Sequence, residues 1–240
     1  MEKPSFISQY TYHIYNRGVE KRDVFLEKRD YLRFINDLHE FNDIRPAPPT
    51  NVRFQTRNPK TTQTTKLSRR LEVEPLNKKE PLVEILCFAL MPNHYHILIR
   101  QLMDNGIVRF MQKLGTGYTM YFNQKRNRVG PLFQGRFKAV LVEKEAHFLY
   151  LPHYIHFNPL DLVSPDWRDK RIDDFHGAMT FLNSYRWSSY LDYTGTKNFP
   201  MVISPGFLQD IIGGPQIYKK AAMEWLREMD FSSIQRLLLE

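Results

Sequence analysis

The sequence predicts an α+β protein in which an antiparallel sheet of four to five strands carries helices packed on one face, followed by a helical C-terminal extension. Segments rich in aromatic and β-branched residues alternate with segments whose apolar residues recur every three or four positions. Turn residues separate many of these segments. The composition, 42% hydrophobic and 25% charged over 240 residues, is typical of a globular protein.

The first elements are a strand, a helix and an irregular segment. Residues 9–16 alternate in the manner of a strand, and Asn16-Arg17-Gly18 is a turn signal that ends it. Residues 27–43 place their large apolar side chains on one helical face. Residues 44–80 have few large apolar residues and many Pro, Thr, Lys and Arg, so we expect a flexible basic insertion within one domain.

The rest of the core follows in chain order as strands 82–90 and 94–100, helix 104–125, strand 137–142 and helix 145–157. Asp104 is the expected N-cap of the longer helix. Pro152 predicts that the last helix starts there or is kinked. We expect a catalytic domain over 1–165 and a mostly helical extension over 166–240, with an amphipathic helix at 217–229.

Charge and cysteine content restrict the function. The net charge is +8, and residues 46–80 and 101–145 each hold eight basic and three acidic side chains. Such blocks are typical of a polyanion partner such as nucleic acid, although a solvated basic surface explains them equally well. The single cysteine, Cys87, excludes an internal disulfide and a multi-cysteine zinc site within one chain. With no secretory signal or membrane-spanning run, we expect a cytoplasmic protein without a membrane partner.

Two residue pairs suggest phosphodiester chemistry. His94 and His96 lie two apart on a predicted strand, so both face the same side and can share a divalent cation. Two half-exposed strand histidines are the alternative, and the role of His13 is open. Tyr154 and Asn158 lie four apart on a predicted helix, where Tyr154 can attack a metal-polarised phosphate and Asn158 offers an oxygen ligand for Mg²⁺ or Mn²⁺. A core tyrosine and a simple helix stop are the alternatives.

Five ordered motifs resemble the IS200-like (Y1) transposases, specifically the branch of REP-associated tyrosine transposases, where REP denotes a repetitive extragenic palindrome. MPNHYHILI at 91–99 resembles the HUH motif of this family. The other motifs are YHIYNRG at 12–18, FMQKLGTGYTMYFN at 110–123, GPLFQGRFK at 130–138 and HYIHFNP at 153–159. The resemblance covers roughly residues 9–165, interrupted by the insertion.

The resemblance implies a ferredoxin-like arrangement and a mechanism. His94, His96 and Asn158 match the residues that hold one divalent metal in the family, and Tyr154 matches the nucleophile. The tyrosine would form a 5′-phosphotyrosine link on single-stranded DNA beside an imperfect hairpin and leave a free 3′-OH. His153 stands where arginine is more usual, and the insertion is longer than in many members.

Further residues are candidates for DNA contact. The basic candidates are Arg17, Arg109, Lys113, Arg126, Arg128, Arg136 and Lys138. Phe133 is a candidate for stacking on an unpaired base, with core packing as the alternative. Tyr95 is expected to point away from its flanking histidines.

Several rival functions remain open at this level. A domesticated protein on the same fold would bind hairpin DNA without cutting it. An RRM-like nucleic-acid-binding module would share the architecture but would not need the histidine pair. A replication initiator or relaxase of the wider HUH class is a second rival, and a phosphoesterase using activated water, without a covalent DNA adduct, is a third. A homodimer and a monomer are both compatible with the sequence.

Overall fold

The computed structural model describes residues 6–46 and 79–228, and the predicted insertion therefore lies largely outside the described residues. The core elements are β1 (Thr11–Arg17), α1 (Lys28–Glu40), β2 (Val83–Met91), β3 (His94–Gln101), α4 (Gly106–Lys125) and β4 (Lys138–Val142). The sheet has the order β2-β3-β1-β4, and its neighbouring strands are antiparallel. This βαββαβ order is the ferredoxin-like arrangement. The predicted α+β class is confirmed.

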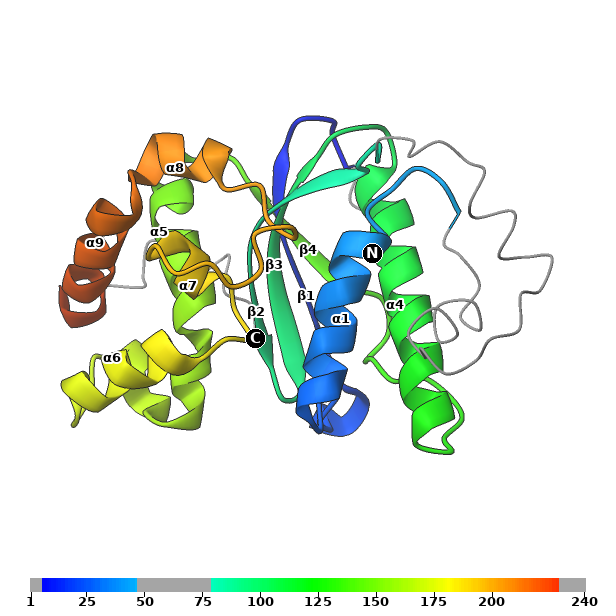
Figure 1. Ribbon diagram of the computed structural model, residues 1–240, viewed down its shortest axis with the longest axis horizontal. Coiled ribbons are helices and arrows are strands. Elements are labelled where there is room, and N and C mark those ends of the chain that lie inside the picture. The colour runs from blue at the N-terminus through cyan, green and yellow to red at the C-terminus, as the bar shows by residue number, and fades with distance from the viewer. Residues whose placement is uncertain (1–5, 47–78, 229–240) are drawn as a thin grey trace, which may run out of the picture.

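Helices α1 and α4 lie side by side on one face of the sheet (Figure 1). Tyr95 of β3 points into this layer, where its ring centroid lies 5.1 Å from that of Phe34. The apolar faces predicted for both helices are buried. Helix α4 begins at Gly106 with Asn105 at its N-cap position, at φ 58°, so the predicted cap at Asp104 is wrong.

A buried carboxylate joins the two helices. Asp30 of α1 is fully buried and accepts hydrogen bonds from the Tyr121 hydroxyl at 2.9 Å and the Lys125 amine at 2.6 Å. Its second oxygen accepts the backbone N–H of Leu26 at 3.0 Å. These contacts satisfy a charge that burial alone would make costly.

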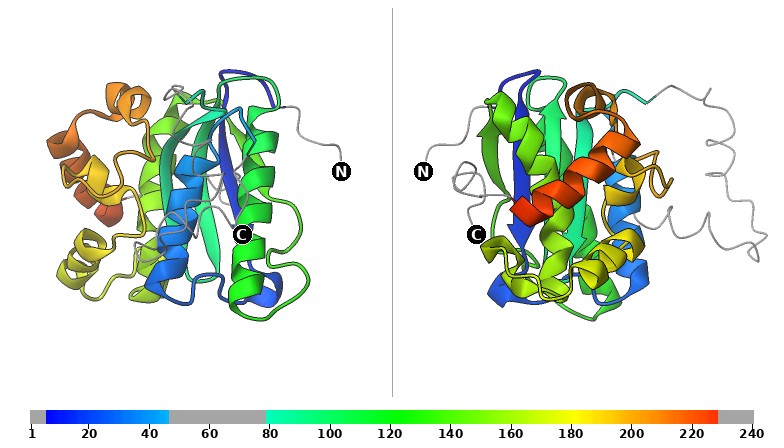
Figure 2. Two further views of the ribbon diagram at one scale, coloured as in Figure 1. Left: turned by 45° about the vertical axis from the view of Figure 1, so that its right-hand side comes forward. Right: turned by 90° about the vertical axis from the view of Figure 1, so that its left-hand side faces the viewer.

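Helix α5 (Glu145–Phe157) lies on the opposite face of the sheet, against β2 and β3 (Figure 2). Of the two alternatives predicted for Pro152, a helix that starts at this residue is wrong, because the helix begins at Glu145 and continues through it. Beyond it come two 3₁₀ helices, η2 (Asn158–Leu162) and η3 (Pro165–Asp169). The extension continues with α6 (Phe175–Ser184), α7 (Tyr190–Tyr193), α8 (Gly206–Ile212) and α9 (Pro215–Glu228).

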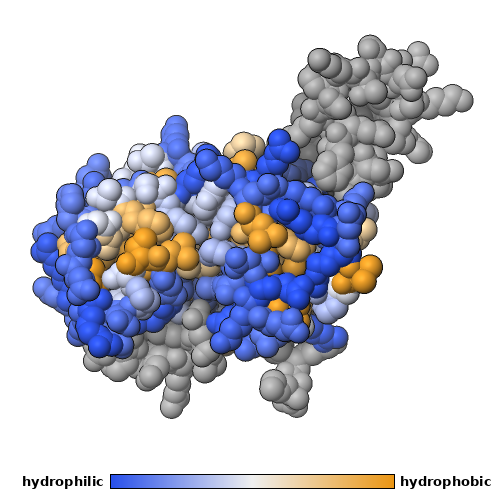
Figure 3. Space-filling model, turned by 90° about the horizontal axis from the view of Figure 1, so that it is seen from below, coloured by the Kyte–Doolittle hydropathy of each residue, from blue (hydrophilic) through white to orange (hydrophobic). Residues whose placement is uncertain are grey.

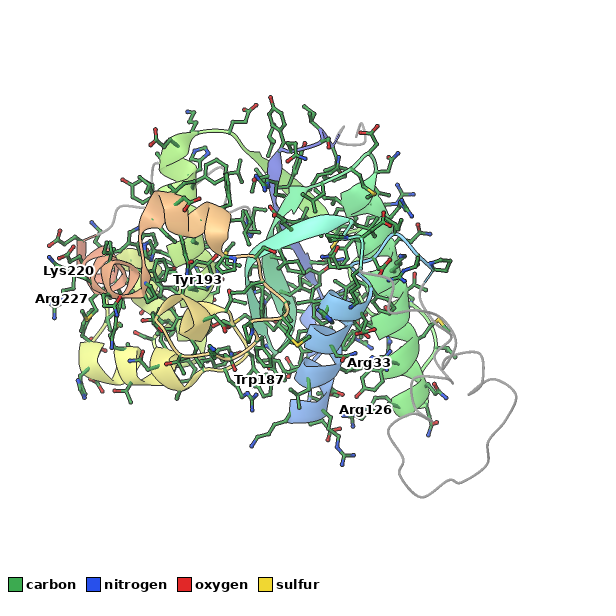
Figure 4. The ribbon with its side chains drawn as sticks, turned by 45° about the horizontal axis from the view of Figure 1, so that its top comes forward. Arg33, Arg126, Trp187, Tyr193, Lys220 and Arg227 are labelled. Atoms are coloured by element: carbon green, nitrogen blue, oxygen red, sulfur yellow. The ribbon has the colours of Figure 1, made fainter. Side chains whose placement is uncertain are left out.

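The extension covers the free edge of β2. The segment before α7 contacts this edge, where Leu90 N–H donates to the Trp187 carbonyl at 2.9 Å and Ser189 N–H donates to the Phe88 carbonyl at 3.0 Å. Trp187 also stacks on Tyr31 of α1, with ring centroids 4.6 Å apart. Figure 4 shows Trp187 beside this helix. The strand edge is thereby protected from pairing with another chain.

Two buried histidines connect α5 to the extension. His156 Nδ1 lies 2.6 Å from the Tyr218 hydroxyl, and its Nε2 lies 2.8 Å from Ser189 Oγ. The ring of His153 stacks on Tyr218 at 4.5 Å. Burial lowers the pKa of His153 to about 3, and burial together with the neighbouring His153 lowers that of His156 well below its ordinary value.

We expect the free energy of unfolding of the metal-free protein to fall as the pH is lowered from 7 to 5. Unfolded histidines take up protons near pH 6.5, whereas His153 and His156 stay neutral in the folded state, so acid favours the unfolded chain. For His153 alone the loss is about 2 kcal/mol at pH 5. Denaturant titrations with chelator present measure it. His153→Phe, which keeps a stacked ring, should show a shallower pH dependence, and an unchanged slope contradicts this explanation.

One face of the molecule is mainly hydrophilic. Seen from below, its apolar residues form separate groups surrounded by hydrophilic ones (Figure 3). Within the described ranges, no helix combines the length and apolar character that crossing a membrane requires.

Candidate active site

The histidine pair lies at the start of β3, on the sheet face opposite α1 and α4. Two residues apart on one strand, His94 and His96 share a face as predicted, with ring centroids 5.1 Å apart. His94 Nδ1 lies 2.6 Å from Asn93 Oδ1, and His96 Nδ1 lies 2.9 Å from His13 Nε2. With both Nδ1 atoms held by neighbours, Nε2 is the coordinating nitrogen that each ring would offer to a metal.

His13, whose role the sequence left open, belongs to this cluster. It lies on β1, beside β3, and its ring stacks on His96 with centroids 5.1 Å apart. It is buried, like His96. His13 therefore orients His96 through both the ring contact and the Nδ1 hydrogen bond.

Helix α5 brings Tyr154 to the histidines. The Tyr154 ring meets His96 edge-on, with centroids 5.9 Å apart at 85°, and meets His13 at 6.4 Å. Asn158 follows one turn later at the end of α5, where its Nδ2 donates to the Tyr154 carbonyl at 2.8 Å. Both side chains are buried. The helix thus delivers the predicted tyrosine to the predicted histidine pair and anchors the predicted amide beside it.

Arg168 of η3 completes the cluster and has no counterpart in the sequence prediction. Its Nη2 donates to Asn158 Oδ1 at 2.9 Å, and its guanidinium lies 5.5 Å from the centre of the Tyr154 ring. It also pairs with Asp161 and stacks over Trp167. A positive charge therefore lies beside the Tyr154 ring.

His96 is held in its neutral form. Burial, followed by the positive charges of Arg168 and Arg17, lowers the pKa of His96 to about 3. A neutral imidazole is the form that binds a metal ion. At neutral pH the ring is therefore ready to coordinate without first losing a proton.

The donor set suits a divalent cation. Two imidazole nitrogens and one amide oxygen are ligands that Mn²⁺ and related ions take. In the part of the chain that the structure describes, no group of three or more His, Cys, Asp or Glu side chains has metal-binding geometry, and the third predicted donor is the amide oxygen of Asn158. That oxygen accepts a hydrogen bond from Arg168, whose positive charge therefore lies beside the proposed ligand.

The predicted DNA contacts separate into two groups. Arg17 and Lys138 lie on the histidine face of the sheet, and Arg136 is exposed in the loop before β4. The other four form intramolecular contacts near α4. Arg109 and Lys113 donate to backbone carbonyls of residues 43–45, Arg126 pairs with Glu27 and Asp30, and Arg128 donates to Asn123 and Pro131.

Phe133 is a core residue in this structure. It is buried, and its ring packs edge-on against Tyr95 at 5.7 Å. This is the alternative that the sequence left open, and a buried ring offers no face to an unpaired base.

Sequence reasoning did not assign Arg168, and it left His13 without a role. His13 had a usable signal, because it lies two residues from Tyr15 on a strand with the same alternation as the histidine pair. Arg168 had none, since it follows Asn158 by ten residues in an irregular segment.

Two of three comparisons with known proteins found a similarity. The model of the family described as IS200-like transposases matches residues 56–158. No significant match was found among curated proteins. A solved structure of a REP-associated tyrosine transposase bound to a REP hairpin is similar at 11% identity, covering 85% of this chain and 90% of that one, with a TM-score of 0.44. The histidine pair, Tyr154 and Asn158 fall within the residues that the model of this family matches.

Proposed function

We propose that this protein is a metal-dependent endonuclease and strand transferase for single-stranded DNA that carries a hairpin, acting through a phosphotyrosine intermediate. The observation that carries the proposal is the contact of Tyr154 with the His96–His13 pair, together with Asn158 one turn further along. These residues come from two strands and a helix, and they match the positions that the family motifs imply.

The proposed reaction exchanges one phosphodiester for another. The Tyr154 oxygen attacks the scissile phosphorus, the bond to the 3′ oxygen breaks, and the products are a 5′-phosphotyrosine link and a free 3′-OH. Attack by a second 3′-OH reverses the step and rejoins strands without an external energy source. His94, His96 and Asn158 would hold a divalent cation, whose contribution is to neutralise charge on the non-bridging phosphate oxygens.

A covalent-adduct assay tests this function. Labelled single-stranded DNA containing a palindrome from beside the gene is incubated with Mg²⁺ or Mn²⁺, and the products are separated on denaturing gels. We expect an adduct that disappears with chelator, and mass spectrometry of the digested adduct should place the DNA on the peptide containing Tyr154. Metal-independent binding without an adduct supports instead a hairpin-binding protein, and cleavage without an adduct supports an activated water.

We expect Arg168→Ala to bind Mn²⁺ at least about 10-fold more tightly than the parent protein. The substitution frees Asn158 Oδ1 from a charged hydrogen-bond donor, and it removes a positive charge from beside the proposed ligands. Calorimetric titration measures the affinity directly. Arg171→Ala is the matched control, because Arg171 lies just after the same segment but pairs at the surface with Asp169. If Arg168→Ala binds Mn²⁺ equally or less tightly than the parent protein, the prediction that Arg168 weakens ion binding is wrong.

A further inference from the structure

On the sheet face that carries the histidines, one part is covered by a helix and another part is open. Helix α5 packs on β2 and β3, so His96 is buried. On the other side of β1, strand β4 forms the sheet edge (Figure 2, right). Lys138 is exposed on this strand, and the next three residues are half-exposed. Among the described elements, β1 therefore marks the boundary between the buried histidine cluster and the open part of this face.

Tyr15 stands at that boundary. In the sheet register it lies between His96 of β3 and Lys138 of β4, and its side chain is half-buried. Its ring stacks on His96 with centroids 5.9 Å apart at 22°, and on His13 at 5.3 Å. The Lys138 amine lies 5.7 Å from the centre of the same ring. A continuous row of rings thus runs from Tyr154 through the histidines to a partly open tyrosine with an ammonium group above it.

Arg17 adds a second basic side chain near Tyr15. It lies two residues after Tyr15, on the same face, and its register partner is His94. One aromatic ring, one ammonium and one guanidinium are therefore grouped next to the two histidines.

This grouping has the chemistry of a single-strand binding site. Unpaired bases stack on aromatic side chains, while Lys and Arg contact the flanking phosphates. Phe133 is buried and cannot serve in this way, whereas Tyr15 is partly open and lies beside the site. The alternative role for Tyr15 is structural, as a ring that keeps His96 in place.

We propose that Tyr15, Lys138 and Arg17 form a nucleotide-stacking subsite that holds the unpaired nucleotide next to the phosphate attacked by Tyr154. The base lies on the Tyr15 ring, displacing the Lys138 amine toward the phosphate. The position of this nucleotide relative to the cleaved bond rests on the proposed function, whereas binding of single-stranded DNA to the subsite does not.

Binding without cleavage tests the subsite. A hairpin oligonucleotide with single-stranded flanks carries 2-aminopurine at one unpaired position at a time, and fluorescence is followed with chelator present. We expect quenching at one or two positions with the parent protein and with Tyr15→Phe. Tyr15→Leu should abolish that quenching and weaken DNA binding about 5- to 150-fold, as expected for one stacked base. Lys138→Ala should lower the salt dependence of binding by about one unit of slope.

Two controls separate recognition from structure. Tyr10→Leu removes an exposed tyrosine just before β1 and should leave quenching and affinity unchanged. The melting temperature and Mn²⁺ affinity of Tyr15→Leu should match those of the parent protein. If Tyr15→Leu instead loses Mn²⁺ binding, and Lys138→Ala leaves the salt slope unchanged, the ring has only a structural role and the subsite is overturned.

The two proposals fail differently. An adduct from the parent protein, together with unchanged quenching and DNA affinity in Tyr15→Leu, overturns the subsite and leaves the proposed reaction standing. No adduct from the parent protein, together with Tyr15-dependent quenching, supports the subsite as a binding element and overturns the proposed reaction.

Discussion

Tyr154→Phe is expected to abolish the covalent DNA adduct and to lower strand cleavage by about 10³-fold or more, as removal of an enzyme nucleophile generally does. Phenylalanine keeps the ring that packs against His96 and His13, so the fold and the neighbouring side chains should persist. A loss of adduct and cleavage would therefore be due to the missing Tyr154 hydroxyl. Gel assays for adduct and cleavage, at saturating Mn²⁺, measure it.

The matched control is Tyr150→Phe. Tyr150 lies one turn earlier on the same helix and is half-buried. Its substitution removes the same hydroxyl group at a position away from the histidines. Its adduct yield should equal that of the parent protein. An adduct that survives in Tyr154→Phe would assign the nucleophile to another tyrosine.

Asp30→Ala is expected to lower the free energy of unfolding by about 3–5 kcal/mol, the usual cost of breaking a buried charge pair. The substitution leaves the Lys125 amine and the Tyr121 hydroxyl without their acceptor between α1 and α4. Urea titration measures the loss. Glu224→Ala, which breaks an exposed pair with Lys220, should change stability by less than about 1 kcal/mol.

The same carboxylate predicts part of the acid sensitivity. Burial alone would raise the pKa of Asp30, but the hydrogen bonds from Lys125 and Tyr121 outweigh it, and the pKa lies below its ordinary value. Its stabilising contribution is complete above the ordinary carboxyl range and is lost as the pH falls through it. Asp30→Ala should therefore show a flatter stability profile below pH 4, and an unchanged profile contradicts this assignment.

Local pattern was sufficient to predict the core strands and helices, and it placed four of the clustered side chains but not His13 or Arg168. Strand alternation placed His94 and His96 on one face and Tyr95 on the other, and helical spacing placed Tyr154 with Asn158. Each of these relations depends only on the repeat of one element. The structure brings together the residues that were expected to act as a group.

Relations between distant segments were not accessible in this way. Arg126 was a candidate for DNA contact, yet it pairs with Glu27 and Asp30, about 100 residues earlier in the chain. Arg168 reaches Asn158 through an irregular segment whose path no periodicity specifies. A basic residue looks the same in sequence whether its partner is a phosphate or a carboxylate on another helix.

The ends of the segment between α1 and β2 are joined where they enter the fold. Ile44 N–H donates to the Glu80 carbonyl at 2.9 Å, and the Asn42 side chain accepts the N–H groups of Leu82 and Val83. This junction lies at the Gln101 end of β3, about 23 Å along the strand from His94. The connection between α1 and β2 therefore enters the fold far from the histidine cluster. The entropic cost of closing such a connection grows slowly with its length, so a short turn spliced between residues 46 and 79 should leave the histidine face of the sheet as it is.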